Sequence, residues 1–474
     1  MLFRHSFYYL LARGGPGLIN FAALAVYSRL LAPIEFGRYV LVLAGVGLAN
    51  VIFFQWLNLV LSRFWAANED EPKRFLGGIM AIFLLLSVMI AGIGCIVVSL
   101  WPDQTWRQLL LLALFLLITQ AWFELNLVLA QVQIKPAWYG KLLTSKTIMA
   151  LGLGGILAWM GMGSNAPITG LIFAYLATFL IFASSAWRGV SPYWPEMESI
   201  HAQLRYGLPL TVTFALSWVM SSSDKLLLGW LIDESTVGIY AAGYDLAFQS
   251  LMLLLTILNT AGYPLVIRAL EKSGVEEARE QLHTNGELLI TSALVGVAML
   301  IALGPQIIEL IIGERFRSGA LLIFPWIALA SAISGIKAFH FDIAFHMEKT
   351  SQWLVLTGGI SAVINVVFNL LLIPPFGILG AAWATLSAYI VAVCTSAWLG
   401  LRLFPMPSLT PILTKAGLIA FLVGATAKLG ADLSEVMWIK LGAGLLLGSL
   451  MALFSVLAVD LGGLRRAVAK RWLL

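Results

Sequence analysis

Charged residues are scarce in this chain. Only 11% of its 474 residues are Asp, Glu, Lys or Arg, whereas 60% are hydrophobic. A soluble globular domain is about a quarter charged and roughly half apolar, so this chain has too few charges to cover the surface of a water-soluble fold of its size. The composition therefore excludes a soluble protein and predicts that lipid is the solvent for most of the surface.

Cysteine is also nearly absent. Cys95 and Cys394 are the only two, and each lies in an apolar run. Two such residues cannot build a disulfide framework or a cysteine-based metal site. We interpret both as small core residues and expect no catalytic residues, no metal and no cofactor.

Long hydrophobic runs are what the sequence has in quantity. A helix needs about 20 apolar residues to cross the hydrocarbon core of a membrane, and Gly or Pro interrupts some of the runs, as at Gly14-Gly15-Pro16 and Gly207-Leu208-Pro209, which predicts broken or bent helices there. The prediction is an all-α polytopic membrane protein with about 14 transmembrane helices. The expected spans are 9–31, 38–62, 76–100, 108–131, 138–160, 167–187, 206–231, 237–266, 285–312, 319–345, 352–373, 377–402, 410–430 and 437–459.

Lys and Arg gather in alternate connections between these spans. Sorted by the nearest connection, 20 of the 29 such residues are assigned to the side of the N-terminus and 7 to the opposite side, while Lys225 and Lys337 are assigned to the spans. Cytoplasmic connections carry the excess of positive charge, so both termini are predicted to be cytoplasmic. The longest connections, about 190–205 and 267–284, are too short for a soluble domain, and the second has the pattern of a short solvated amphipathic helix. The net charge of +5 reflects these connections and does not indicate nucleic-acid binding.

A motif recurs after six spans. The segment from Leu30 to Tyr39 and the segment from Leu231 to Tyr240 both end in apolar-Gly-x-Tyr, with their glycines 201 residues apart. Since six is even, the two halves would point the same way across the membrane. We therefore expect two six-helix lobes, 1–190 and 200–404, around a central cleft that suits alternating access, and residues 405–474 would add two helices and a basic cytoplasmic tail.

Several motifs resemble those of one family. The stretch Arg29-Leu30-Leu31-Ala32-Pro33-x-Glu35-Phe36-Gly37-x-Tyr39 resembles the opening signature of the oligosaccharide flippases. These are the O-antigen and polysaccharide transporters of the multidrug/oligosaccharidyl-lipid/polysaccharide superfamily. Further similar motifs follow in the same order up to about residue 400. They are Tyr206-Gly207-x-Pro209, Ser223-Asp224-Lys225-x-x-x-Gly229, Val237-Gly238-x-Tyr240-x-x-x-Tyr244 and Asn365-x-x-x-Asn369-x-x-x-x-Pro374-x-x-Gly377-x-x-Gly380-Ala381-Ala382.

The resemblance implies a fold and a function. The fold would be that of the MATE transporters, and the protein would lie in the bacterial cytoplasmic (inner) membrane. It would move a polyprenyl-diphosphate-linked oligosaccharide from the cytoplasmic to the outer leaflet, for O-antigen, capsule or exopolysaccharide biosynthesis. Its partners would be this lipid-linked glycan, membrane lipid, and a polysaccharide polymerase with its chain-length machinery. The resemblance does not imply which sugar is carried.

Cationic residues within the spans are the first candidate site residues, because an ionisable group at the bilayer centre costs about 2.5–3.5 kcal/mol on insertion scales. Lys225 and Lys337, with Arg29 near the outer end of the first span, are candidates for binding the anionic diphosphate. The alternative is that each lysine neutralises an acid on another helix.

Acidic residues within the spans are the second set. Asp224, Asp245, Glu124 and Asp342 are candidates for coupling transport to protons, because a buried carboxylate can titrate near neutral pH. A structural salt bridge is the favoured alternative for each of them. His340 lies one turn from Lys337, and Asp342 lies one turn from His346, so each pair shares a helix face. A metal site would need more ligands than these residues supply.

Two other functions remain as alternatives. A cation-coupled drug antiporter of the same superfamily would have twelve spans and an acidic cleft, which the lysines at 225 and 337 disfavour. A membrane glycan polymerase or ligase would need a long outer loop with Arg, His or carboxylate residues. The longest outer segment, about 430–437, is too short for that.

Overall fold

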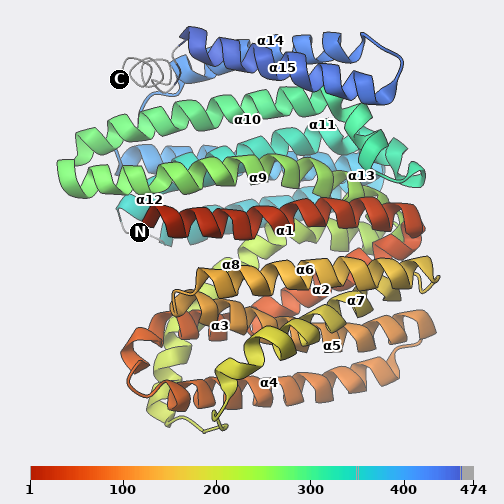
Figure 1. Ribbon diagram of the computed structural model, residues 1–474, viewed down its shortest axis with the longest axis vertical. Helices are drawn as coiled ribbons and strands as arrows, with labels where there is room; N and C mark the ends of the chain where they lie inside the picture. The colour runs from red at the N-terminus through yellow and green to blue at the C-terminus, as the bar shows by residue number, and fades with distance from the viewer. Residues whose placement is uncertain (1, 349, 351, 460, 462–474) are drawn as a thin grey trace. The chain divides into compact units, whose positions relative to one another are not determined.

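The computed structural model describes residues 2–348, 350, 352–459 and 461, and for residues 2–14 and 16 it describes the backbone alone. Every regular element among these residues is helical. By its internal contacts the chain forms two compact units, Met1–Gly238 and Ile239–Leu474, which run from red to yellow-green and from green to blue in Figure 1. The lobes 1–190 and 200–404 expected from the repeat stay a prediction, and most of the basic tail lies outside the described residues.

The first unit is a bundle of long helices in which α6 packs on both α1 and α7, and α2 packs on both α5 and α8. Pro33, Pro72 and Pro136 begin α2, α4 and α6 at the first helical position, where the missing N–H costs nothing. The helices are α1 (Leu2–Leu30), α2 (Pro33–Phe53), α3 (Gln55–Phe64), α4 (Pro72–Leu100), α5 (Gln104–Val132), α6 (Pro136–Trp159), α7 (Asn165–Thr178) and α8 (Met197–Leu231), with the short turns η1 (Ala66–Asn68), η2 (Phe179–Ala183) and η3 (Ser184–Trp187).

The second unit is also a helix bundle. Its α10 packs against α11 and α14, and α14 packs against α15. Inside α13, Gly377 has φ 57° and ψ −133°, a conformation open essentially to glycine alone, and it divides this helix into two segments. The elements are α9 (Glu234–Ser273), α10 (Val275–Ile311), α11 (Glu314–Ile336), η4 (Lys337–Phe341), α12 (Ile343–Met347), α13 (Gln352–Leu403), α14 (Thr410–Ala431) and α15 (Met437–Val459). The start of α9, up to Gly238, still belongs to the first unit.

The number of membrane crossings agrees with the sequence-based prediction. Within the described residues, 11 helical segments are long and apolar enough to cross a membrane. One of them is α13, which at 52 residues and 1.5 Å per residue contains two crossings of an about 30 Å core. Two further helices lie outside those 11 segments: α1, with the shorter apolar segment Gly17–Leu30, and the 35-residue α8. Counted with them, the helices of the described chain can supply the fourteen crossings of an all-α multi-pass membrane protein.

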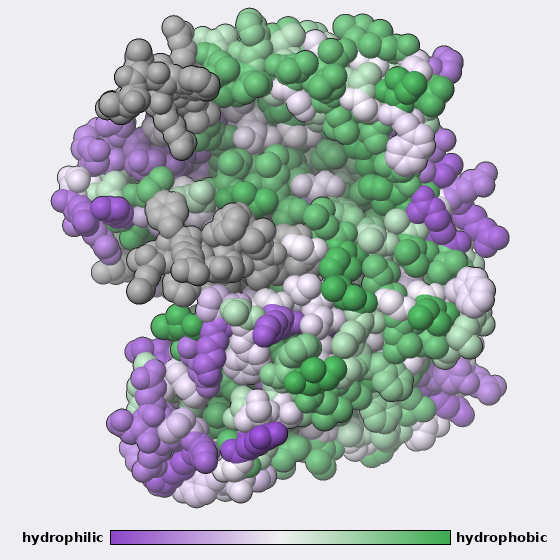
Figure 2. All heavy atoms as spheres, viewed as in Figure 1, coloured by the Kyte–Doolittle hydropathy of each residue, from purple (hydrophilic) through white to green (hydrophobic). Residues whose placement is uncertain are grey.

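The surface has the pattern that a lipid-embedded bundle requires. In both units hydrophobic residues cover the middles of the helices, and hydrophilic residues gather at their ends (Figure 2). On α4, for example, Val88, Ile96 and Leu100 are 69%, 62% and 78% exposed. A soluble protein does not present rows of such residues to water, so these faces are in contact with lipid.

Four details differ from the expectation. Cys95 and Cys394, which were expected in the core, are both exposed. The segment 267–284 is not a separate helix, because α9 continues to Ser273 and α10 begins at Val275, after a turn at Gly274 with φ 91°. Gly207-Leu208-Pro209 does not break α8. Gly207 instead lets the helix lie against Trp56, where a Cβ would be 3.0 Å from the Trp56 Cβ. The helix α1 likewise runs through its Gly-Gly-Pro stretch.

Candidate functional site

The first unit holds a polar cluster at the centre of its bundle. Glu124 lies on α5, and both of its carboxylate oxygens accept hydrogen bonds from side-chain amides. Asn50 on α2 donates through Nδ2 to Oε2 at 2.8 Å, and Gln120, one turn earlier on α5, donates through Nε2 to Oε1 at 2.9 Å. Residues four apart share a helix face, so α5 presents Gln120 and Glu124 together toward α2.

A lysine on the next helix completes this cluster. Lys146 on α6 interacts electrostatically with Glu124, and its Nζ lies 5.3 Å from the ring centroid of Tyr175 on α7. The Tyr175 ring also packs against Phe123, with centroids 4.9 Å apart. An ammonium over an aromatic face is stabilised by about 0.5–2 kcal/mol, more when it is desolvated. Glu124 and Lys146 are both half-buried, and with Asn50 and Tyr175 they join four helices, α2, α5, α6 and α7, with little access to water.

The two charges lie at similar depth in the bundle. Glu124 is eight residues before the end of α5 at Val132, and Lys146 is ten residues after the start of α6 at Pro136. At 1.5 Å per residue these positions are about 12 and 15 Å from the helix ends. Both therefore lie near the middle of a hydrocarbon core about 30 Å thick.

Sequence reasoning missed Lys146. Counting basic residues by the nearest connection placed it in the cytoplasmic set, which was wrong, because it lies within α6. Asn50 and Tyr175 were not singled out either. A usable signal was present, since Glu124 and Lys146 lie nearly the same number of residues before and after the short α5–α6 turn. Antiparallel helices bring such positions to one level.

In the second unit the structure brings two of the predicted site residues together. Lys337 donates through Nζ to Oδ2 of Asp342 at 2.7 Å. Residues five apart in an α-helix point about 140° away from each other, given 3.6 residues per turn. Here η4 is a π-turn, and the Asp342 N–H donates to the Lys337 carbonyl at 2.9 Å, so the two side chains face each other. Such π-bulges are frequent at functional sites.

His340 lies within the same π-turn and is fully buried. Among the described residues neither of its ring nitrogens has a hydrogen-bond partner, and Oδ1 of Asp342 has none either. The ring lies against Gly286 on α10, where a Cβ would be 2.6 Å from its Cε1. The described residues contain no group of three side chains that could hold a metal ion.

The remaining predicted residues lie elsewhere. Asp224 is buried on α8 and accepts a hydrogen bond at 2.8 Å from the backbone N–H of Lys225, whose side chain is half-buried. Asp245 is half-buried on α9. Arg29 is exposed at the end of α1, where its guanidinium donates to the Ala25 carbonyl at 2.9 Å. The roles expected for these residues in binding and coupling stay predictions.

Known proteins resemble this chain in sequence. Over 235 residues it is 24% identical to the "Probable flippase AglR" of Haloferax volcanii, and the matched region covers 48% of each chain. Over 175 residues it is 24% identical to the "Amylovoran biosynthesis protein AmsL" of Erwinia amylovora, and the matched region covers 35% of this chain and 43% of that protein. The chain thus spans less than half the length of these curated relatives.

Solved structures resemble it over nearly the whole length. The "Lipid II flippase MurJ, inward closed conformation" matches with a TM-score of 0.79 at 14% identity. The superposed region covers 95% of this chain and 98% of that chain. An inward-facing multidrug resistance MATE family transporter of the MOP superfamily has a TM-score of 0.56 at 14% identity, with 85% and 93% covered. At these identities the likeness is one of fold, and it confirms the predicted MATE-like architecture.

A family profile described as "Polysaccharide biosynthesis protein" matches residues 2–270, more than half of the chain. This match confirms the family resemblance that the sequence motifs indicated. The chain belongs to the polysaccharide biosynthesis protein family.

Proposed function

We propose that this protein is a flippase that moves a polyprenyl-diphosphate-linked oligosaccharide from the cytoplasmic to the outer leaflet of the bacterial inner membrane. The glycan would serve O-antigen, capsule or exopolysaccharide biosynthesis. The observation that carries the proposal is the match in fold to a lipid II flippase over 95% of the chain, in a protein of the polysaccharide biosynthesis family. The name of the relative AglR, a probable flippase, supports the same class of activity.

The cargo explains why a protein is needed. A sugar head carries many hydroxyl groups, and each polar group that enters hydrocarbon without a hydrogen bond costs several kcal/mol. Two lobes, 1–190 and 200–404, would rock about a wet cleft and expose the head group first to one side and then to the other. The lipid tail would stay in the bilayer. Both termini would be cytoplasmic, and a polysaccharide polymerase with its chain-length machinery would receive the product.

The charged residues suggest how binding and coupling are joined. Lys225, Lys337 and Arg29 would attract the diphosphate, and the carboxylates at 124, 224, 245 and 342 would carry the coupling charge. In the second unit, the 2.7 Å bond between Lys337 and Asp342 supports an exchange of partners. A diphosphate oxygen that binds the ammonium would take the place of the carboxylate, and the released carboxylate would then accept a proton.

Reconstitution tests the proposal. The purified protein is placed in liposomes that carry a lipid-linked oligosaccharide with a fluorescent sugar, and an added glycan-cleaving enzyme reports the sugar that reaches the outer leaflet. Flippase activity is expected to raise the accessible fraction from one half toward completion. Protein-free liposomes and heat-inactivated protein are the controls.

Three results would contradict the proposal. One is unchanged surface polysaccharide after clean deletion of the gene in its host. The second is proton- or sodium-driven efflux of organic cations without glycan transport, which would indicate a drug antiporter. The third is transfer of labelled sugar by the isolated protein, which would indicate a membrane polymerase or ligase.

A further inference from the structure

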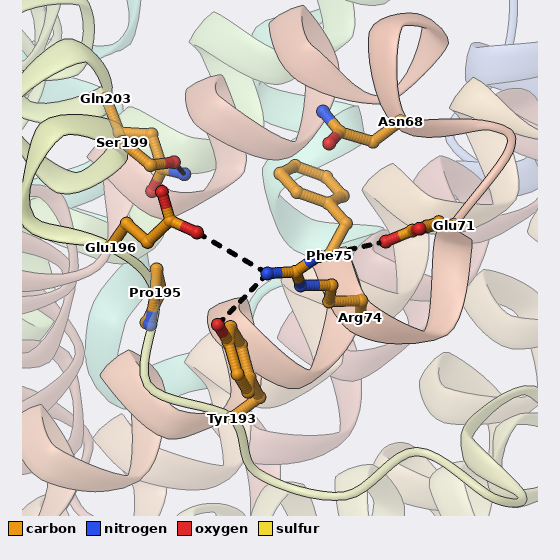
Figure 3. A pocket seen from close by; sticks show the side chains of 10 residues that line it. Asn68, Glu71, Arg74, Phe75, Tyr193, Pro195, Glu196, Ser199 and Gln203 are labelled. Carbon is orange, nitrogen blue, oxygen red and sulfur yellow. Dashed lines mark hydrogen bonds and ion pairs between the residues drawn. The ribbon is translucent and has the colours of Figure 1, made fainter.

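A polar pocket of about 270 Å³ lies in the first unit, where the connection from α3 to α4 meets the segment that leads into α8 (Figure 3). All of its walls come from this unit. The topology inferred from the basic connections places it on the cytoplasmic side. Its lining residues are Asn68, Glu71, Arg74, Phe75, Gly78, Tyr193, Pro195, Glu196, Ser199 and Gln203.

Arg74 lies at the centre of the pocket wall, with its guanidinium directed at three oxygens (Figure 3). It donates to the Tyr193 hydroxyl at 3.1 Å, to Glu71 at 3.3 Å and to Glu196 at 3.5 Å. Its guanidinium carbon also lies 5.1 Å from the centroid of the Tyr193 ring. These contacts hold Arg74 against the wall and leave carboxylate oxygens of Glu71 and Glu196, both exposed, available to a ligand.

Two adjacent glycines, one turn after Arg74 on α4, hold the segment from Tyr193 to Pro195 close to this helix. The Tyr193 N–H donates to the Gly77 carbonyl at 3.1 Å. A Cβ on Gly78 would lie 2.9 Å from Cγ of Pro195, so only glycine lets the segment approach this closely. The segment is therefore fixed on α4, and the pocket does not depend on a ligand for its shape.

Gln203 on α8 is the feature that points to a ligand. It is only 6% exposed, and its Nε2 donates to Oγ of Ser199 at 3.1 Å. Its Oε1 has no hydrogen-bond partner among the described residues, although the side chain lines the pocket. A buried acceptor left unpaired costs about 1–3 kcal/mol. A ligand that donates a hydrogen bond at this point would remove that cost.

The lining defines the chemistry of that ligand. Two carboxylates face one guanidinium, so the pocket repels anions and does not suit a diphosphate. Its free groups are mainly acceptors, which require donors on the ligand, while the rings of Phe75 and Tyr193 supply apolar surface. A sugar ring has hydroxyl donors around its edge and C–H groups on its faces. The volume lies just below the roughly 300–1,000 Å³ of pockets for drug-sized ligands, which fits one ring.

We propose that this pocket binds one hydroxylated sugar ring of the glycan head on the cytoplasmic side, before transport. The identity of the cargo rests on the proposed function, whereas the sugar-binding property rests on the pocket alone. The pocket would hold the neutral part of the head group apart from the cationic residues that would bind its diphosphate.

Saturation-transfer NMR on the full-length protein in nanodiscs tests this assignment. The probes are free glucose, galactose, mannose, rhamnose and N-acetylglucosamine, with spermidine as a cationic probe. At least one sugar is expected to bind, and Gln203→Met and Glu196→Gln should each weaken its binding about tenfold or more, the loss of one good hydrogen bond. The matched control is Glu198→Gln, an exposed acid two residues along that does not line the pocket, and it should bind as the parent does.

Three outcomes would overturn the assignment: no sugar binds, the Gln203 and Glu196 variants bind as tightly as the control, or only spermidine binds. Thermal unfolding of each variant checks that the fold is intact. The liposome assay separates the two proposals. A protein that binds sugar in this pocket but moves no lipid-linked glycan contradicts the flippase, whereas glycan transport without sugar binding contradicts the pocket alone.

Discussion

Gly37 and Gly238, the equivalent glycines of the two repeated motifs, pack backbone against backbone in the first unit. A Cβ on Gly238 would lie 2.9 Å from the backbone nitrogen of Gly37, and a Cβ on Gly37 would lie 3.0 Å from that of Gly238. Beside this contact Arg38 donates to Glu234 at 2.7 Å, and the Trp106 indole N–H donates to the same carboxylate at 2.6 Å. The start of α2 thus meets the start of α9 at a contact that only glycine permits.

This contact predicts an effect on stability. In Gly37→Ala the new methyl group would overlap the carbonyl of Glu234, and overpacking of this kind costs about 1–3 kcal/mol. The expected result is a clearly lower unfolding temperature of the purified protein in detergent. Gly45→Ala on the same helix, with no atom within 4 Å of the added Cβ, is the control and should unfold as the parent does. Equal unfolding temperatures for the two variants would contradict the close packing.

The pair formed by Glu124 and Lys146 predicts non-additive mutations. Glu124→Gln or Lys146→Met alone leaves one charge without its counterion. The expected loss is about 2–3 kcal/mol, below the roughly 3–5 of fully buried pairs, because both residues are half-buried. The double variant removes both charges and should recover most of the loss. A double-mutant cycle of unfolding free energies measures this coupling, and strictly additive losses would show that the two charges do not interact.

The intramembrane lysines predict losses of transport. The first test variant is Lys225→Ala. The second combines Lys337→Ala with Asp342→Asn, so that no buried charge is left alone. Each should lower the rate of glycan flipping about 10- to 100-fold. This corresponds to losing a charged hydrogen bond worth about 1.5–3 kcal/mol. Lys440→Ala on α15, whose lysine pairs with Glu435, is the control. Transport at the parental rate in both test variants, with equal protein in the membrane, would rule out the diphosphate role.

Accessibility to a membrane-impermeant thiol reagent tests the orientation. In a chain without Cys95 and Cys394, a cysteine at Asp70 is expected to react only from the cytoplasmic side. One at Met160, in the α6–α7 connection and 67% exposed, should react only from outside. The opposite pattern would invert the topology inferred from the basic connections.

The sequence predicted the number and position of most helices because hydropathy over about 20 residues decides whether a segment enters lipid. It did not predict the break at Phe54, which separates α2 from α3, or the single glycine turn between α9 and α10. Both depend on backbone angles at one or two residues. The boundaries of the other predicted spans came directly from the ends of the apolar runs.

For the site, the limits were geometric. A regular helix places His340 near Lys337, but the π-turn brings Asp342 to Lys337, and no rule based on 3.6 residues per turn predicts that pairing. Lys146 was sorted by its distance along the chain from a connection, when its depth in the bilayer was the relevant coordinate.

The short turn between α5 and α6 has a consequence for biogenesis. If each helix left the translocon alone, Glu124 or Lys146 would oppose its entry into lipid by about 2.5–3.5 kcal/mol. Only residues 133–135 separate the helices, so both charges are within reach of each other as soon as the second helix is synthesised. We therefore expect the two helices to be released as one preassembled hairpin, with the two opposite charges already close to each other before lipid surrounds them.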